Sequence, residues 1–188
     1  EAHRESFPAM GPDLTQKLPG VRPIIIGAGP AGLFCALRLS EYGVRCTLLE
    51  RGSPAYQRML KISKYWRRGE LDPDDNVCFG EGGAGLFSDG KLITRIKSAH
   101  IPYVMQRLVD FGAPPETAYT SNPHLGSNRI RPLIKKLTDQ LRERGHDLRY
   151  NTRVDKLLIQ DGQVQGVQLS NGEKLHSPWV ILATGHSS

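Results

Sequence analysis

The chain has 188 residues, of which 38% are hydrophobic and 23% are charged, and its formal net charge is +6. This length and composition fit one ordinary globular domain, and they exclude a disordered chain or a pair of full-sized domains. Cys35, Cys46 and Cys78 form no C-x-x-C pair, which argues against a disulfide scaffold and a cysteine-rich zinc site. The sequence has neither an apolar run of membrane-helix length nor the apolar core of a signal peptide. We therefore expect a cytoplasmic protein.

Residues 1–20 contain several prolines and glycines and little periodicity, so they are predicted to be an N-terminal extension or linker. Residues 21–188 are predicted to form one α/β domain. Its first strand is the β-branched run Pro23–Ile26, a helix follows over Pro30–Tyr42, and Val44–Leu49 forms a second strand. This order predicts a β-α-β unit.

The turn between the first strand and its helix has the pattern G-x-G-x-x-G, formed by Gly27, Gly29 and Gly32 with Pro30 and Ala31 between them. In such a unit the first glycine permits the tight turn, and the second lets the backbone approach a pyrophosphate. The third lets helix and strand pack closely. Free amides and the helix dipole at the start of the helix favour phosphate. The turn therefore predicts a dinucleotide site.

Glu50 ends the second strand, 18 residues after Gly32. At this spacing an acidic residue accepts hydrogen bonds from an adenosine ribose. An acid there repels a 2′-phosphate, which argues against an NADP-type ligand at this site. The motif leaves NAD and FAD open, and a glycine-rich turn without a ligand is the third interpretation.

A long insertion, residues 51–127, follows the second strand. It holds a basic helical stretch at residues 55–68, a glycine cluster over Gly80–Gly90 and a predicted helix over Pro102–Phe111. The basic residues of the first stretch are Arg58, Lys61, Lys64, Arg67 and Arg68. We expect them on a solvated helix face; a nucleic-acid patch and a surface that docks onto other parts of the chain are the alternatives.

An amphipathic helix is predicted over Asn128–Arg144. The apolar period then changes to two over residues 147–176, where short strands, beginning with Leu148–Tyr150, and tight turns predict a β-meander. Trp179–Ala183 is predicted to be a last buried strand. A doubly wound NAD-type domain would continue with alternating strands and helices. This order resembles instead the FAD-binding domain of glutathione-reductase-like flavoproteins, a three-layer Rossmann-like fold with helices on one face of a parallel sheet and a β-meander on the other.

A more specific resemblance comes from the blocks Lys64–Pro73, Asn76–Leu92, Pro123–Arg129 and Ala183–Ser187. They resemble a large family of bacterial-type FAD-dependent dehydrogenases, and the likeness covers residues 22–188. It implies bound FAD and an oxidoreductase in which hydride passes through the flavin N5. The small-molecule substrate stays open, and NADH or NADPH is the candidate electron donor.

The resemblance also implies which residues contact FAD. Those expected at the pyrophosphate are Gly27, Gly29, Pro30, Ala31 and Gly32, and those at the adenosine end are Glu50, Arg51 and Val154. The residues expected along the flavin and its ribityl chain are Gly82, Gly83, Ala84, Gly85 and Arg129, while Ala183, Thr184 and Gly185 pass close to the dinucleotide. Lys91 and His186 are candidates for a positive group near the flavin N1, and Cys78 lies beside the glycine cluster. The catalytic residues stay unknown.

Flavoproteins of this type return to the flavin with a later Gly-Asp segment, and the chain contains no Gly-Asp dipeptide. We therefore expect a fragment of a longer enzyme that lacks its C-terminal substrate region and is inactive by itself. A nucleic-acid-associated flavoprotein of the tRNA-modifying type and a non-catalytic dinucleotide-binding module are the alternatives. No metal-ligand spacing is present, and His146, like the histidines at 3, 100 and 176, is expected at the surface.

Overall fold

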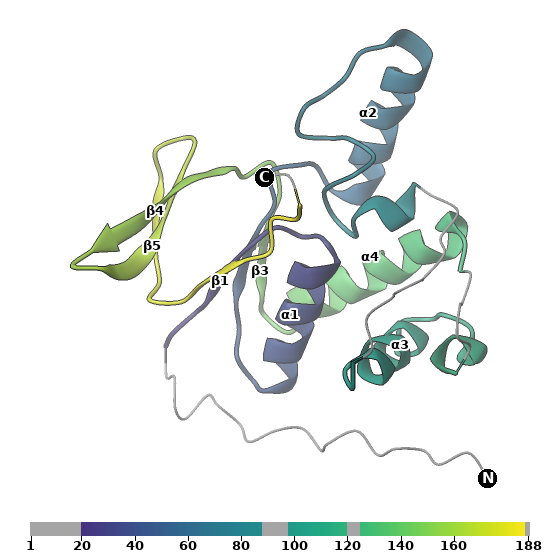
Figure 1. Ribbon diagram of the computed structural model, residues 1–188, viewed down its shortest axis with the longest axis horizontal. Helices are drawn as coiled ribbons and strands as arrows, with labels where there is room; N and C mark the ends of the chain where they lie inside the picture. Colours follow the sequence, from purple (N-terminus) through teal and green to yellow (C-terminus); the bar gives the residue numbers. More distant parts are fainter. Residues whose placement is uncertain (1–19, 88–97, 120–124, 187–188) are drawn as a thin grey trace.

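The computed structural model describes residues 20–87, 98–119 and 125–186. Within these residues a parallel sheet is formed by β1 (Ile24–Ile26), β2 (Thr47–Leu49), β3 (Asp147–Arg149) and β7 (Val180–Leu182), in the order β3-β2-β1-β7 (Figure 1). The two central strands, β1 and β2, are mostly apolar and buried, as strands covered on both faces are. The first predicted strand is confirmed as buried, but the last is not: β7 lies at the edge of the sheet, and Leu182 is 63% exposed. Within the described residues β7 pairs with β1 alone, so the prediction of a buried last strand is wrong.

Helices α1 (Pro30–Glu41) and α4 (Ser127–Glu143) cover one face of this sheet (Figure 1). On the sheet side, Ile25 and Leu48 belong to the core that these helices close. The buried residues of α4 are Ile130, Leu133, Ile134, Leu137, Thr138 and Leu141. This is the single apolar stripe that its sequence period predicts.

An antiparallel meander covers the other face. It consists of β4 (Val154–Gln160), β5 (Gln163–Leu169) and β6 (Lys174–His176), which lie at the left of Figure 1. A second core joins Ile24 and Leu49 to residues of β5. Successive strand residues point to opposite faces, so neighbouring residues of β1 and β2 supply the two separate cores. The described residues thus form the predicted three layers.

One predicted strand belongs to a different sheet. The sequence pattern predicts that residues 147–149 begin the meander, but β3 pairs in parallel with β2, and the Asp147 N–H donates to the carbonyl of Cys46 at 3.0 Å. The meander therefore covers residues 154–176 rather than 147–176. The reason is that α4 acts as the crossover helix of a β-α-β connection, which returns the chain to the same parallel sheet.

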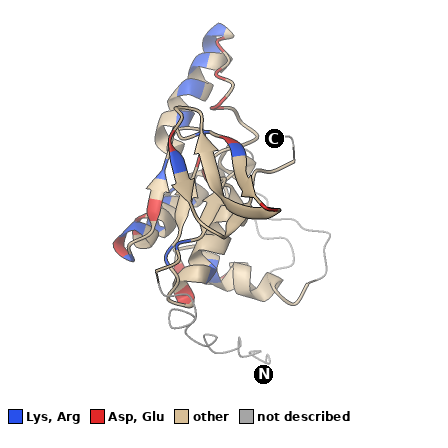
Figure 2. Cartoon of the chain, turned by 90° about the vertical axis from the view of Figure 1, so that its left-hand side faces the viewer, with Lys and Arg blue, Asp and Glu red and all other residues tan. Residues whose placement is uncertain are grey.

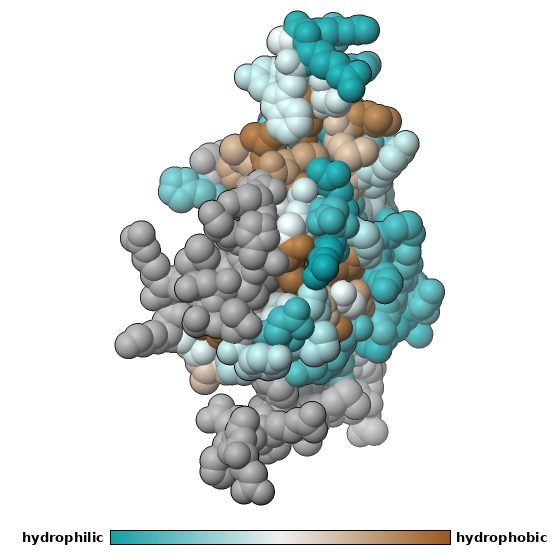
Figure 3. Space-filling view, turned by 90° about the vertical axis from the view of Figure 1, so that its right-hand side faces the viewer, coloured by the Kyte–Doolittle hydropathy of each residue, from teal (hydrophilic) through white to brown (hydrophobic). Residues whose placement is uncertain are grey.

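The insertion contributes α2 (Ala55–Arg68), α3 (Ile101–Asp110) and two 3-10 turns, η1 (Ala84–Leu86) and η2 (Pro115–Ala118). Helix α2 projects from the body as a basic arm (Figures 1 and 2). Figure 3 shows hydrophilic residues at the tip of this arm and apolar surface nearer the body. No helix in the described ranges has both the length and the apolar character needed to cross a membrane.

His146 is buried, so its predicted surface position is wrong. It follows α4 at the edge where the parallel strands begin, and its Nδ1 accepts from the backbone N–H of Cys46 at 3.1 Å. Burial, aided by nearby arginines, lowers the pKa of His146 to about 4. The ring is therefore neutral in the folded protein at neutral pH.

Candidate functional site

A cavity of about 630 Å³ opens where β1, β2 and β7 end. In open parallel sheets, ligands bind outside the carboxyl ends of the strands. The ends of β1 and β2, the start of β4 and the segment after β7 line it, together with a loop of the insertion. The lining residues are Ile26, Gly27, Gly29, Pro30, Ala31, Leu49, Glu50, Arg51, Cys78, Phe79, Gly80, Gly83, Ala84, Thr152, Arg153, Val154, Leu182, Ala183, Thr184 and Gly185.

The three glycines of the first turn have three different surroundings. Gly27 has a φ of 107°, and a Cβ there would clash with the carbonyl of Ala183. A Cβ at Gly32 would clash with the carbonyl of Gly27, so α1 packs directly against the turn. A Cβ at Gly29 would meet no atom within 4 Å, although Gly29 lines the cavity. Only the second glycine therefore leaves open space for a ligand.

The start of α1 makes this edge of the cavity electropositive. Gly29 is the N-cap and Pro30 the first residue of the helix. The first-turn amides of a helix have no acceptor within it, and Ala31 of this turn lines the cavity. The positive end of the helix dipole adds to this effect. The geometry suits an anionic group such as a diphosphate.

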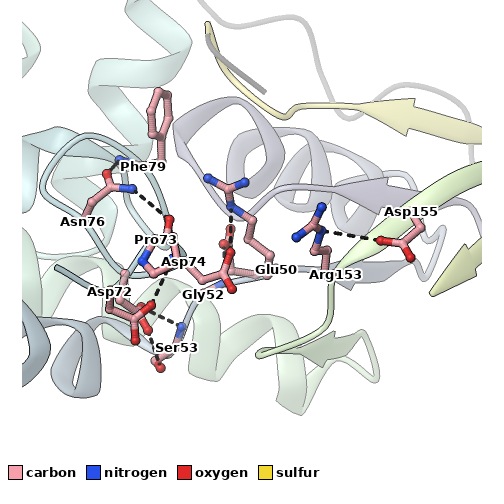
Figure 4. A network of polar contacts seen from close by, with 12 residues as sticks. Glu50, Gly52, Ser53, Asp72, Pro73, Asp74, Asn76, Phe79, Arg153 and Asp155 are labelled. Carbon is pink, nitrogen blue, oxygen red and sulfur yellow. Dashed lines mark hydrogen bonds and ion pairs between the residues drawn. The ribbon is translucent and has the colours of Figure 1, made fainter. Parts of the chain in front are cut away.

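Glu50 lies at the end of β2 and is only 5% exposed. Its Oε2 accepts from the Ala28 N–H at 2.8 Å. Its Oε1 accepts from the Gly52 N–H, also at 2.8 Å (Figure 4). An ionised carboxylate has about four acceptor positions, so two bonds leave acceptor capacity for a ligand hydroxyl. The amides hold the side chain in one orientation at the cavity wall.

Two arginines lie at the same end of the cavity. Arg51 pairs with Asp74 at 3.6 Å. Arg153 pairs with Asp155 at 3.5 Å (Figure 4). The Thr152 N–H donates to the Glu50 carbonyl at 2.8 Å, which brings the start of β4 alongside the end of β2. Thr152 and Arg153 were not predicted as site residues because only this tertiary pairing brings them to the cavity.

A loop of the insertion, residues 76–83, which we call the glycine loop, closes the cavity against α1. The Gly82 N–H donates to the Ala28 carbonyl at 2.9 Å. A Cβ on Gly83 would lie 2.8 Å from the Cδ of Pro30. The aromatic ring of Phe79 lies against Gly185, whose added Cβ would be 3.3 Å from it. Two glycine-rich segments far apart in the sequence therefore meet in one wall.

Arg58 contacts this loop through hydrogen bonds to its carbonyls. The prediction that Arg58 lies on a solvated helix face is therefore wrong. Its side chain is 0% exposed. Burial lowers the pKa of its guanidinium to about 10, with nearby acids opposing the shift, so the group stays protonated at neutral pH. One feature of the sequence does indicate this burial. Arg58 lies four residues before Ile62, on the same face of the helix, and Ile62 is also buried.

The remaining basic residues of α2 divide into two groups. Lys61 pairs with Asp72 at 3.0 Å and with the buried Asp75 at 2.6 Å. Lys64, Arg67 and Arg68 are exposed. The basic surface of this helix is thus smaller than the sequence indicated, which weakens the case for a nucleic-acid patch.

Buried acids attach the arm to the body. The carboxylate of Glu81 accepts from the Ala55 N–H and from the Tyr150 hydroxyl, both at 2.5 Å. Burial and the Glu81 charge raise the pKa of Tyr150, so its hydroxyl stays protonated and donates. Asp75 accepts from the backbone N–H and the hydroxyl of Ser53, each at 2.8 Å. These contacts hold the start of α2, the glycine loop and the segment after β3 together.

Most of the residues predicted to contact a dinucleotide line this cavity. They are Gly27, Gly29, Pro30, Ala31, Glu50, Arg51, Gly83, Ala84, Val154, Ala183, Thr184 and Gly185. Cys78, next to the predicted glycine cluster, also lines the cavity and is exposed.

The other predicted residues do not line the cavity. Gly32 packs on the turn itself, and a Cβ on Gly82 would clash with Leu86 rather than enter the cavity. Gly85 has Ile130 as its neighbour, and Arg129 is exposed on the first turn of α4. In each case the backbone turns the residue toward the helical layer or the solvent.

Lys91 lies outside the described residues, and His186 is exposed just after the cavity segment. No cluster of metal-ligating side chains occurs among the residues that the structure describes.

Comparison with known proteins gives relatives over most of the chain. An uncharacterized protein of Clostridium beijerinckii is 38% identical over 167 residues, which are 89% of this chain and 31% of that protein. Protein FixC of Escherichia coli K12 is 30% identical over 166 residues, 88% of this chain and 36% of that protein. The chain therefore spans about a third of the length of these curated relatives.

Among solved structures, the GidA-related protein from Thermus thermophilus has a TM-score of 0.49 and 18% identity. The match covers 88% of this chain and 53% of that one. The model of the pyridine nucleotide-disulphide oxidoreductase family matches residues 21–188. With a parallel sheet, a glycine turn at its carboxyl edge and a meander on its second face, the chain belongs to the pyridine nucleotide-disulphide oxidoreductase family.

Proposed function

We propose that this chain is the FAD-binding part of an oxidoreductase and that the cavity at the ends of β1, β2 and β7 holds the dinucleotide. Members of its family are FAD-binding flavoproteins. The observation that carries the assignment to this cavity is Gly29, which has open space where a side chain would project and which caps the positive end of α1. A diphosphate fits this combination of space and charge.

In this proposal the lining residues form two groups, one toward the adenosine end of the cavity and one toward the flavin end. Gly29 and the first-turn amides of α1 hold the diphosphate, and Glu50 accepts from the adenosine ribose hydroxyls. Arg51 and Val154 lie at the adenosine end, where β2 and β4 meet. The residues on the flavin side are Phe79, Gly80, Gly83, Ala84, Ala183, Thr184 and Gly185.

Bound FAD supplies the hydride chemistry at its N5, and the protein supplies binding and orientation. The backbone of the glycine loop and of the segment after β7 forms a wall of small residues, so the flat ring system can lie close to the main chain. The buried carboxylate of Glu50 fixes the adenosine end. We further propose that residues 21–188 form one dinucleotide-binding domain with residues 51–127 as its insertion. Substrate contacts are proposed to come from other parts of the longer protein.

The deciding experiment is an absorption spectrum of the purified intact protein after incubation with FAD and removal of free flavin. We expect retained flavin bands near a 1:1 ratio. Their loss on adding NADH or NADPH under anaerobic conditions would identify the electron donor and distinguish an enzyme from a passive binder. A colourless protein that also leaves flavin fluorescence unchanged would contradict the proposal.

A further inference from the structure

We propose that Arg58 is a positioning residue that shapes the glycine loop for flavin binding; this inference rests on the proposed function. Its guanidinium donates hydrogen bonds to four backbone carbonyls of the loop. Nε donates to the carbonyl of Asn76 at 2.8 Å, and Nη1 donates to that of Glu81 at 2.9 Å. Nη2 donates to the carbonyls of Val77 at 3.3 Å and Gly83 at 3.2 Å. A single side chain therefore holds both ends of the loop.

These bonds determine which backbone dipoles face the cavity. Gly80 and Gly83 line the cavity on one side and contact Arg58 on the other. Because the carbonyl of Gly83 points to the guanidinium, its negative end is held away from the space assigned to an anionic dinucleotide. The buried positive charge lies one layer of backbone away from that space. Both effects favour a ligand that carries phosphates and electron-rich oxygens.

The space around the side chain is matched to arginine. A Cβ on Gly80 would lie 3.2 Å from the Cδ of Arg58, so the loop rests directly on the side chain. The guanidinium also stacks on the ring of Phe87, with its carbon 4.5 Å from the ring centroid, and Arg131 lies 5.3 Å from the same centroid. Lysine has a compact ammonium instead of a planar fork. It would keep the charge but could not reach these carbonyls together.

The test compares Arg58→Gln with wild type in the intact protein. Arg67→Gln is the matched control, because Arg67 lies on the same helix and is exposed. FAD affinity is measured by quenching of flavin fluorescence, and the flavin environment by visible circular dichroism. We expect Arg58→Gln to bind FAD about tenfold more weakly or worse, as loss of supporting contacts around a bound group commonly does. The visible dichroism should change, whereas Arg67→Gln should match wild type in both.

Two further measurements separate positioning from a general loss of folding. Methylguanidinium added to an Arg58→Ala variant should restore part of the FAD affinity, and methylammonium should not. If Arg58→Gln does not fold, Arg58→Lys replaces it, and we expect weakened binding with altered dichroism there too. Wild-type affinity and dichroism in a folded variant, or equal rescue by both cations, would overturn the inference. Failure of wild type itself to bind FAD would instead contradict the proposed function.

Discussion

The two glycine segments at the cavity are held in place by different means. The first turn, Gly27–Gly32, is held mainly by backbone groups: the Gly27 N–H donates to the Leu49 carbonyl at 2.7 Å, and Gly32 lies against the Gly27 carbonyl. The one side chain that bonds to it in the described residues is Glu50, which the motif itself places at the end of β2. The glycine loop is held by side chains from elsewhere, above all Arg58. A turn held by glycine geometry and by the end of the neighbouring strand can be predicted from its motif, because the motif contains both. A loop supported by remote side chains needs those partners to be known.

The largest effect is expected at the first turn. Gly29→Val should abolish FAD retention, because the new side chain occupies the open space next to the start of α1. Gly29 has a φ of −65°, which valine adopts, so the fold should persist. Retained flavin is measured by absorbance after gel filtration, and the melting temperature of the apoprotein checks folding. Wild-type retention would contradict the assignment of the cavity.

Gly32→Ala provides the contrast within the same turn. Its Cβ would clash with the Gly27 carbonyl rather than enter the cavity. Helix α1 would have to move away from β1, and overpacking of this kind costs typically about 1–3 kcal/mol or more. We expect a lower free energy of unfolding in urea even without FAD. Loss of flavin with unchanged apoprotein stability would show that Gly32 acts on the ligand instead.

His146 should make the free energy of unfolding depend on pH. It lies at the opposite edge of the sheet from the cavity. Since the pKa of His146 falls from 6.5 to about 4 on folding, the unfolded chain binds the proton more readily. The contribution of the buried neutral imidazole to the free energy of unfolding is therefore complete above pH 6.5 and is lost as the pH falls toward 4. The loss amounts to up to about 3 kcal/mol, at about 1.4 kcal/mol per pKa unit.

The measurement is the free energy of unfolding between pH 4 and pH 7. His146→Gln should flatten this dependence, whereas His176→Gln should not, because His176 is exposed. An unchanged slope in His146→Gln would exclude this residue as the cause. Because the effect is global, it should weaken the first turn and the glycine loop alike.

The smallest effect is expected at Glu50. Glu50→Ala removes the acceptor of the Ala28 and Gly52 amides and the proposed ribose contact, and it should weaken FAD binding by about 1–3 kcal/mol. Glu143→Ala is the control, since Glu143 is an exposed carboxylate on α4. Titration calorimetry with FAD measures the difference. Equal affinities in the two variants would remove Glu50 from the site.

Much of the fold and part of the site could be predicted from the sequence. The β-α-β unit, the helical stripe of α4 and the alternation in the meander follow from local periodicity. The placement of Gly29 and Glu50 at the cavity follows from the turn motif and its spacing. The positive φ of Gly27 also follows from the motif, whose first glycine permits the tight turn.

Other features depended on contacts between distant parts of the chain. Residues 147–149 have the pattern of a meander strand, and only their pairing with β2 assigns them to the parallel sheet. Arg58 and His146 look like surface residues because both are polar, yet each is buried where remote backbone groups bond to it. The same holds for Gly82, which faces the helical core although its sequence neighbour Gly83 lines the cavity.

By itself, then, the sequence determined the order of elements and the dinucleotide-type turn, because periodicity and glycine geometry act over a few neighbouring residues. The three layers were expected from the resemblance of that order to glutathione-reductase-like flavoproteins. The tertiary structure decided which sheet β3 joins, which glycines face the cavity and which charged side chains are buried. Those outcomes depend on which residues far apart in the chain meet, and the burial of a polar group is stable only where such partners satisfy its hydrogen bonds.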